Sequence, residues 1–136
     1  MALQNLTILY VEDNQETQRL VARLLTTMVK EVYLASDGQE GLEVYKDKTP
    51  DIVLTDINMP NMNGLEMSSE IRNLNQAQTI AVFTAFNDPD YMQEASRLGI
   101  GTYLLKPFER EQFFNSLNYL AMVIEMQQEN PSQNNQ

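Results

Sequence analysis

The sequence predicts an α/β fold in which a five-stranded parallel sheet carries helices on both faces. Two observations lead to this prediction. Short runs of apolar and β-branched residues alternate five times with longer segments that have a helical pattern of apolar residues, which is the pattern of repeated β-α units. Three of the short runs are almost continuously apolar, as in strands that are covered on both faces. A chain of 136 residues has room for one such domain.

The five predicted strands are short and end where polar residues begin. The first, third and fourth are the nearly continuous apolar runs, so we expect them to be fully buried. In chain order, the five predicted strands are residues 6–11, 32–35, 52–55, 80–84 and 103–105.

A helix is predicted after each strand. The fourth has the clearest ends, because Asp88 is a suitable N-cap, Pro89 suits the first helical position and Gly99 suits the residue after the helix. Apolar residues at helical spacing mark one face of each helix. In chain order these are Leu20, Val21, Leu24, Leu25 and Met28; Leu42 and Tyr45; Met67, Ile71 and Leu74; Met92, Ala95 and Leu98; and Phe113, Leu117, Leu120 and Ile124.

The domain is predicted to cover residues 1–126. Residues 127–136 are rich in Gln and Asn and have no apolar face, which is typical of a disordered tail or the start of a linker.

Composition excludes several kinds of chemistry. The chain has no cysteine and no histidine, so disulfides, Cys/His zinc sites and thiol or imidazole catalysis are excluded. Its formal net charge of -10 opposes contact with nucleic acid or anionic membrane. No apolar run approaches the about 18 residues of a membrane-spanning helix. The first residues do not resemble a signal peptide, so we expect a cytoplasmic protein.

Polar residues stand where the predicted strands end. Glu12 and Asp13 follow the first strand, Asp56 follows the third, Thr84 closes the fourth and Lys106 follows the fifth. The carboxyl ends of parallel strands meet at one edge of a sheet, where ligands bind in such folds. Each residue alone is ordinary at a strand end, but their joint occurrence indicates a functional site.

These residues suit phosphoryl transfer. Three neighbouring carboxylates repel one another, and a hard divalent cation such as Mg²⁺ relieves that repulsion and binds phosphate oxygens as well. Lys106 and Thr84 offer positive charge and a hydroxyl to the phosphoryl oxygens. Asp56 is then available as the nucleophile that forms an acyl phosphate.

The same residues resemble the receiver domain of response regulators in two-component signalling. Further matches are residues 59–64 (Met-Pro-Asn-Met-Asn-Gly), Thr84-Ala85 and Lys106-Pro107-Phe108. The likeness covers about residues 6 to 124. It implies a flavodoxin-like, doubly wound (βα)5 fold with strand order 2-1-3-4-5. It also implies a signalling phosphoacceptor that catalyses only its own phosphorylation and dephosphorylation.

The resemblance implies a role for each matching position. Asp56 is the expected phosphoacceptor, and Thr84 and Lys106 are expected to contact the phosphoryl group. Mg²⁺ is expected on Glu12, Asp13 and Asp56 and on the backbone carbonyl of Asn58.

A conformational switch is implied as well. Thr84 and the aromatic Tyr103 are the expected switch residues, and the face formed by the fourth helix, fifth strand and fifth helix is expected to change. The Lys106–Pro107 peptide bond is expected to be cis. Phe86 stands where relatives often carry a polar group, which predicts slow hydrolysis of the acyl phosphate.

Three alternative functions fit the sequence less well. A phosphatase of the haloacid dehalogenase-like class needs an acid at position 58, where this chain has Asn58, and needs room for a cap domain. A flavin-binding protein needs a phosphate-binding loop after the first strand, where this chain is acidic. A pseudo-receiver that only binds partners conflicts with the full set of acid, hydroxyl and lysine.

The expected partners are a phosphoryl donor and an output. A sensor histidine kinase or a phosphotransfer protein must act in trans, since this chain has no histidine. The output is left open between an unknown partner of a stand-alone receiver and an effector domain beyond Gln136.

Overall fold

The computed structural model describes residues 3–85 and 88–129. Phe86, for which the sequence predicts an effect on acyl-phosphate hydrolysis, lies outside the described residues.

Strands and helices alternate as predicted, after a short 3-10 turn at Leu3–Asn5. The strands are β1 (Thr7–Val11), β2 (Glu31–Ala35), β3 (Ile52–Thr55), β4 (Thr79–Thr84) and β5 (Thr102–Leu105). The helices are α1 (Gln15–Leu25), α2 (Gly38–Lys48), α3 (Gly64–Leu74), α4 (Pro89–Arg97) and α5 (Arg110–Glu129).

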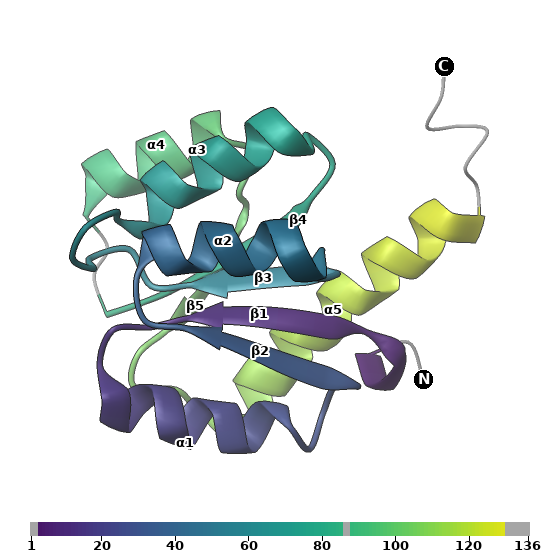
Figure 1. Cartoon of the computed structure of the whole chain (residues 1–136). Helices are drawn as coiled ribbons and strands as arrows, with labels where there is room; N and C mark the ends of the chain where they lie inside the picture. Colours follow the sequence, from purple (N-terminus) through teal and green to yellow (C-terminus); the bar gives the residue numbers. More distant parts are fainter. Residues whose placement is uncertain (1–2, 86–87, 130–136) are drawn as a thin grey trace.

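The five strands form one parallel sheet in the order β2-β1-β3-β4-β5, which confirms the predicted fold and strand order. In the centre of the sheet, Ile8 of β1 lies opposite Val32 on one side and Ile52 on the other. The labelled strands β1, β2 and β3 run towards the same edge in Figure 1. The residues that follow each strand therefore gather at that edge.

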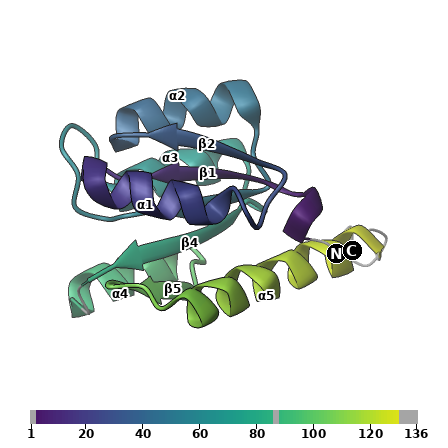
Figure 2. The ribbon, with the colours of Figure 1, turned by 90° about the horizontal axis from the view of Figure 1, so that it is seen from below.

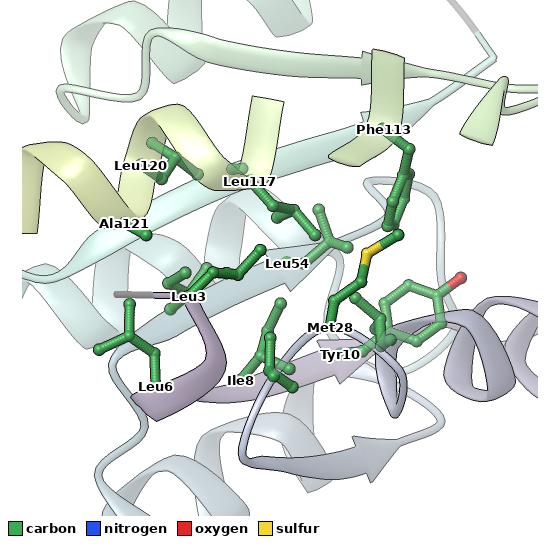
Figure 3. Packing of buried hydrophobic residues seen from close by; sticks show 14 of the residues in the cluster. Leu3, Leu6, Ile8, Tyr10, Met28, Leu54, Phe113, Leu117, Leu120 and Ala121 are labelled. Carbon is green, nitrogen blue, oxygen red and sulfur yellow. The ribbon is translucent and has the colours of Figure 1, made fainter. Parts of the chain in front are cut away.

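Two apolar cores lie on opposite faces of the sheet, and alternate strand residues supply them, because successive side chains of a strand point to opposite faces. Ile8 and Tyr10 of β1 face the core under α1 and α5, whereas Leu9 and Val11 face the core under α2, α3 and α4. Figure 1 shows α2, α3 and α4 above the strands and α1 below them, and Figure 2, seen from below, shows α1 in front of β1 and α5 beside β4 and β5. Figure 3 shows the first core, where Tyr10 and Ile8 lie among residues of α5 and the 3-10 turn.

Local hydrogen bonds fix where the helices begin. Asn14, Asp37 and Asp88 each accept a backbone N–H bond as the N-cap of α1, α2 and α4. Asn63 forms a full capping box with Glu66 at the start of α3. Each such cap contributes about 1 kcal/mol. The predicted start of α4 at Asp88 and Pro89 is confirmed. Gly99 directly follows the C-cap Leu98, as predicted, and has a left-handed φ of 74°.

The end of β3 and the start of α3 are in close contact at Gly64. The amide of Gly64 donates to the carbonyl of Ile57 at 2.8 Å, and a Cβ atom at this position would lie 1.9 Å from the carbonyl oxygen of Asp56. Only glycine fits this approach, which fixes the backbone of Asp56 against α3.

Some apolar residues predicted to face the core do not. Leu20 and Leu74 are 53% and 55% exposed, because Leu20 lies beside the buried Val21 stripe of α1 and Leu74 is the last residue of α3. Met28 is buried, but it lies beyond α1, which ends at Leu25. Met92 is 37% exposed on α4.

Helix α5 continues to Glu129, three residues beyond the predicted end of the domain at residue 126. A sequence without apolar periodicity can extend a helix that is already nucleated, since each added residue then gains a backbone hydrogen bond. Within the described residues, no helix has both the length and the apolar character needed to cross a membrane.

Candidate functional site

Three carboxylates meet at the edge where β1 and β3 end. Glu12 and Asp13 follow β1, and Asp56 follows β3. Each of the three offers an oxygen atom that lies within 4.8 Å of the others. Glu12 is buried, Asp56 is half-buried and Asp13 is exposed, so the cluster is open to solvent on the Asp13 side.

Lys106, directly after β5, reaches two of these carboxylates. Its Nζ atom lies 2.6 Å from Oε1 of Glu12 and 2.9 Å from Oδ2 of Asp56. The ammonium group also lies 5.3 Å from the centre of the Phe83 ring. The backbone amide of Lys106 donates to the carbonyl of Thr84 at 3.0 Å, which ties the ends of β4 and β5 together. The Lys106–Pro107 bond is cis, as expected.

Glu12 is held by three donors although its side chain is almost fully buried. The Tyr10 hydroxyl and Lys106 donate to Oε1, and the amide of Asn14 donates to Oε2 at 3.2 Å. Burial raises the pKa of Glu12 above its ordinary value, and the hydrogen bonds from Lys106 and Asn14 only partly oppose that rise.

The pKa of Lys106 is raised as well. Burial acts to lower it, but the hydrogen bonds and charges of Glu12 and Asp56 outweigh this effect. The lysine is therefore held in its charged form between two acids.

Both carboxylate oxygens of Asp56 have donors. Oδ1 accepts from the amide of Ile57 at 2.7 Å, and Oδ2 accepts from Lys106. The backbone amide of Asp56 donates to the carbonyl of Val11 at 3.0 Å, which fixes the end of β3 against β1. The carboxylate thus has a defined orientation on a rigid element, as a nucleophile requires.

Thr84 and Tyr103 lie on the same side of the sheet, towards α4. Thr84 is 4% exposed at the end of β4, two residues after Val82, and Val82 is paired with Tyr103 on β5. The Tyr103 ring is half-buried against the core on this face, and its hydroxyl lies 3.4 Å from the carbonyls of Met92 and Ile100.

Asn58 is exposed two residues after Asp56. Together with Asp13 it lines a shallow pocket of about 420 Å³. Its side-chain oxygen accepts a hydrogen bond of 2.8 Å from the hydroxyl of Tyr91 in α4. Tyr91 and Tyr10 are site residues that could not be predicted, since neither has a local signal beyond its place in a predicted helix or strand.

The donor set fits a hard divalent cation. Three carboxylates at the edge of the sheet supply only oxygen atoms, and Mg²⁺ binds through one or two carboxylates while it keeps several waters. Asp13 is exposed, so the cluster is accessible to such waters from this side.

Comparison with known proteins identifies the family. A family model described as the response regulator receiver domain matches residues 8–118. The chain belongs to this family. Receiver domains act as signalling phosphoacceptors in two-component systems, and this assignment decides against the phosphatase and flavin-binding alternatives.

Individual relatives agree with the family. The receiver domain is 34% identical over 120 residues to the nitrate/nitrite response regulator protein NarL of Escherichia coli, covering 85% of this chain and 54% of NarL. It is 29% identical over 111 residues to the chemotaxis protein CheY of Halobacterium salinarum, covering 82% of this chain and 92% of CheY.

Solved structures have the same fold. The N-terminal domain of an uncharacterized protein from Wolinella succinogenes superposes with a TM-score of 0.84 at 30% identity, covering 90% of this chain and 98% of that chain. The chemotaxis response regulator CheY4 of Vibrio cholerae gives 0.77 at 28% identity, covering 85% and 98%. The chain thus spans about half the length of NarL but nearly all of CheY.

Proposed function

We propose that this receiver domain takes a phosphoryl group onto Asp56 from a sensor histidine kinase or a phosphotransfer protein. The observation that carries the proposal is the meeting of Glu12, Asp13 and Asp56 within 4.8 Å, with Lys106 bonded to two of them. We assign Mg²⁺ to these three carboxylates and to the backbone carbonyl of Asn58. Bound there, the cation neutralises negative charge on the phosphoryl oxygens.

Asp56 is the nucleophile in this proposal. A carboxylate oxygen of Asp56 forms a bond to phosphorus as the bond from phosphorus to the donor nitrogen breaks, and the electron pair of that bond leaves with the donor imidazole. Lys106 is already charged and 2.9 Å from Asp56, so its ammonium group can shift from the carboxylate to an oxygen of the phosphoryl group. Thr84 donates its hydroxyl to another oxygen.

The output is a change of the α4-β5-α5 face. Thr84 moves towards the phosphoryl group, and Tyr103 on the same side of the sheet turns into the space that this movement opens. The phosphoryl group biases this equilibrium only through contacts that differ between the two states. Either a partner protein or an effector domain, as in relatives longer than this chain, reads the change.

The receiver domain comprises residues 1–126, with residues 127–136 as a polar segment whose first part continues α5 to Glu129. We place it in the cytoplasm. Its net charge of -10 repels nucleic acid and anionic membrane, so it contacts neither directly.

Acetyl phosphate provides the direct test. With Mg²⁺ it should add one phosphoryl group to the wild-type chain, and intact-mass spectrometry under cold, neutral conditions should detect it. Asp56→Asn should take none, whereas Asp47→Asn, which changes an exposed acid on α2, should be labelled like the wild type. Labelling of Asp56→Asn to the same extent would show that another residue is the acceptor.

A further inference from the structure

A hydrogen bond joins the loop after Asp56 to helix α4. Tyr91, in the first turn of α4, donates its hydroxyl to Oδ1 of Asn58 at 2.8 Å, across 33 positions of sequence. Asn58 stands in the loop after β3, whose backbone is fixed at Asp56 by the bond to Val11. The contact therefore links the start of a helix to the loop that follows the phosphoacceptor.

The Tyr91 ring is held in place beneath this bond. The ring is half-buried and packs against the same core as Met59 and Met62, which belong to the loop after β3. Tyrosine has two side-chain torsions, so a packed ring places its hydroxyl at little further entropic cost. The hydrogen bond connects α4 to Asn58, and the ring packs against the core that Met59 and Met62 also contact.

The other end of α4 is attached separately. Arg72 of α3 donates from Nε to the carbonyl of Leu98, the residue that caps α4, at 2.6 Å. The same guanidinium also donates to the carbonyl of Gln78. A change at Tyr91 would therefore act on the start of α4, while the bonds of Arg72 still hold its other end.

We propose that Tyr91 is a positioning residue, which orients the loop at Asn58 for metal binding and couples occupancy of the site to the position of α4. This inference rests on the proposed function, since it assigns the Asn58 carbonyl to Mg²⁺. The Tyr91 hydroxyl does not touch the cation or the phosphoryl group. It acts by restricting the conformations of the loop that presents the Asn58 carbonyl.

Linkage makes the effect reciprocal. If the bond from Tyr91 favours the loop conformation that binds Mg²⁺, then Mg²⁺ must favour the position of α4 in which that bond forms, by the same free energy. The metal site and the output face would thus communicate before any phosphoryl group arrives.

The test removes one oxygen atom. Tyr91→Phe keeps the ring and its packing but loses the hydroxyl, and Tyr119→Phe on the exposed side of α5 is the matched control. Titration calorimetry of the unphosphorylated chain with Mg²⁺ should show about two- to fivefold weaker binding for Tyr91→Phe, as expected for one exposed hydrogen bond, and no change for Tyr119→Phe.

Two further variants make the test specific. Asn58→Ala keeps the backbone carbonyl and removes the acceptor, so it should weaken Mg²⁺ binding to a similar extent. The double variant should be no weaker than the single ones, because both remove the same bond. Independent, multiplicative effects would overturn the proposal, as would an affinity of Tyr91→Phe equal to or tighter than that of the wild type.

NMR amide shifts supply the second readout. Mg²⁺ should shift amides at the start of α4 in the wild type, and these shifts should shrink in Tyr91→Phe while those of Asp13 and Asp56 persist. Unchanged α4 shifts in Tyr91→Phe would refute the coupling. Failure of the wild-type chain to bind Mg²⁺ would instead refute the proposed function, so the two failures are distinguishable.

Discussion

Replacing Lys106 by methionine tests how the acid cluster is held together. Met keeps an unbranched apolar chain beside Phe83 but removes the two charged hydrogen bonds to Glu12 and Asp56. Glu12 is 1% exposed, so the loss leaves a buried carboxylate without its cation, a change that costs several kcal/mol in a fully buried pair.

The expected loss of stability is smaller here, because the Lys106 and Asp56 side chains are 20% and 15% exposed and solvent screens their pairing. We expect Lys106→Met to lower the free energy of unfolding by about 2–3 kcal/mol without metal. This corresponds to a fall of roughly 10 °C in Tm for a domain of this size.

Magnesium should reduce this difference. The ammonium group repels a cation bound to the same carboxylates, so Lys106→Met should bind Mg²⁺ more tightly than the wild type and gain more stability from it. Urea unfolding followed by circular dichroism, in EDTA and in millimolar Mg²⁺, measures both effects. Lys30→Met, at an exposed position, is the control for loss of one positive charge.

If Lys106→Met had the same free energy of unfolding as Lys30→Met in EDTA, the expected role of Lys106 in stabilising the cluster would be refuted. That result would mean that Glu12 is satisfied by Tyr10 and Asn14 alone. A difference from the wild type that is the same with and without Mg²⁺ would refute the second step, in which lysine and cation compete for the same oxygens.

Three other substitutions have defined outcomes. Asp13→Asn should abolish Mg²⁺ binding in calorimetry and slightly raise Tm in EDTA, because it removes one of three clustered charges; a clear loss of stability would contradict this. Thr84→Ala should still accept phosphate from acetyl phosphate but give smaller NMR shifts over α4, β5 and α5, and full-sized shifts would argue against the coupling. Asp37→Ala should cost about 1 kcal/mol as a lost N-cap in urea unfolding at neutral pH. Hydrogen bonds from the Glu40 amide and the Asn61 side chain lower the pKa of Asp37 in the folded chain. The stability that Asp37 contributes is therefore fully present above its pKa in the unfolded chain, and it is lost as the pH falls through its lower pKa in the folded chain. A Tm difference between wild type and Asp37→Ala that stayed constant into strong acid would contradict this assignment.

Much of the fold could be predicted because burial on both faces leaves a simple pattern. The continuous apolar runs of β1, β3 and β4 are almost wholly buried, and the side chains of Phe113 and Leu117 face the core as their spacing predicts. Exposure of Leu20 and Leu74 could not be predicted from spacing, since it depends on which face of α1 packs on the sheet and on where α3 ends.

The candidate site was predictable in its members but not in its contacts. Parallel topology alone brings Glu12, Asp56 and Lys106 to one edge. The Tyr91–Asn58 bond depends on side-chain positions in two elements that touch only after packing, and a tyrosine in a helix has no local feature that indicates it.

The contacts of Glu12 also reduce the repulsion expected among the three carboxylates. Sequence alone treats the three carboxylates as equal, but the structure gives Glu12 three donors and leaves Asp13 exposed. Lys106 is shared by Glu12 and Asp56, so part of the repulsion is already relieved before any cation binds. The stabilisation gained from Mg²⁺ is therefore the difference between how strongly Mg²⁺ and Lys106 interact with the same oxygens. It is not the full relief of the repulsion among three carboxylates. It follows that the affinity for Mg²⁺ should depend on the groups that hold Lys106, including Tyr10 through Glu12 and Phe83 beneath the ammonium group, as much as on the carboxylates themselves.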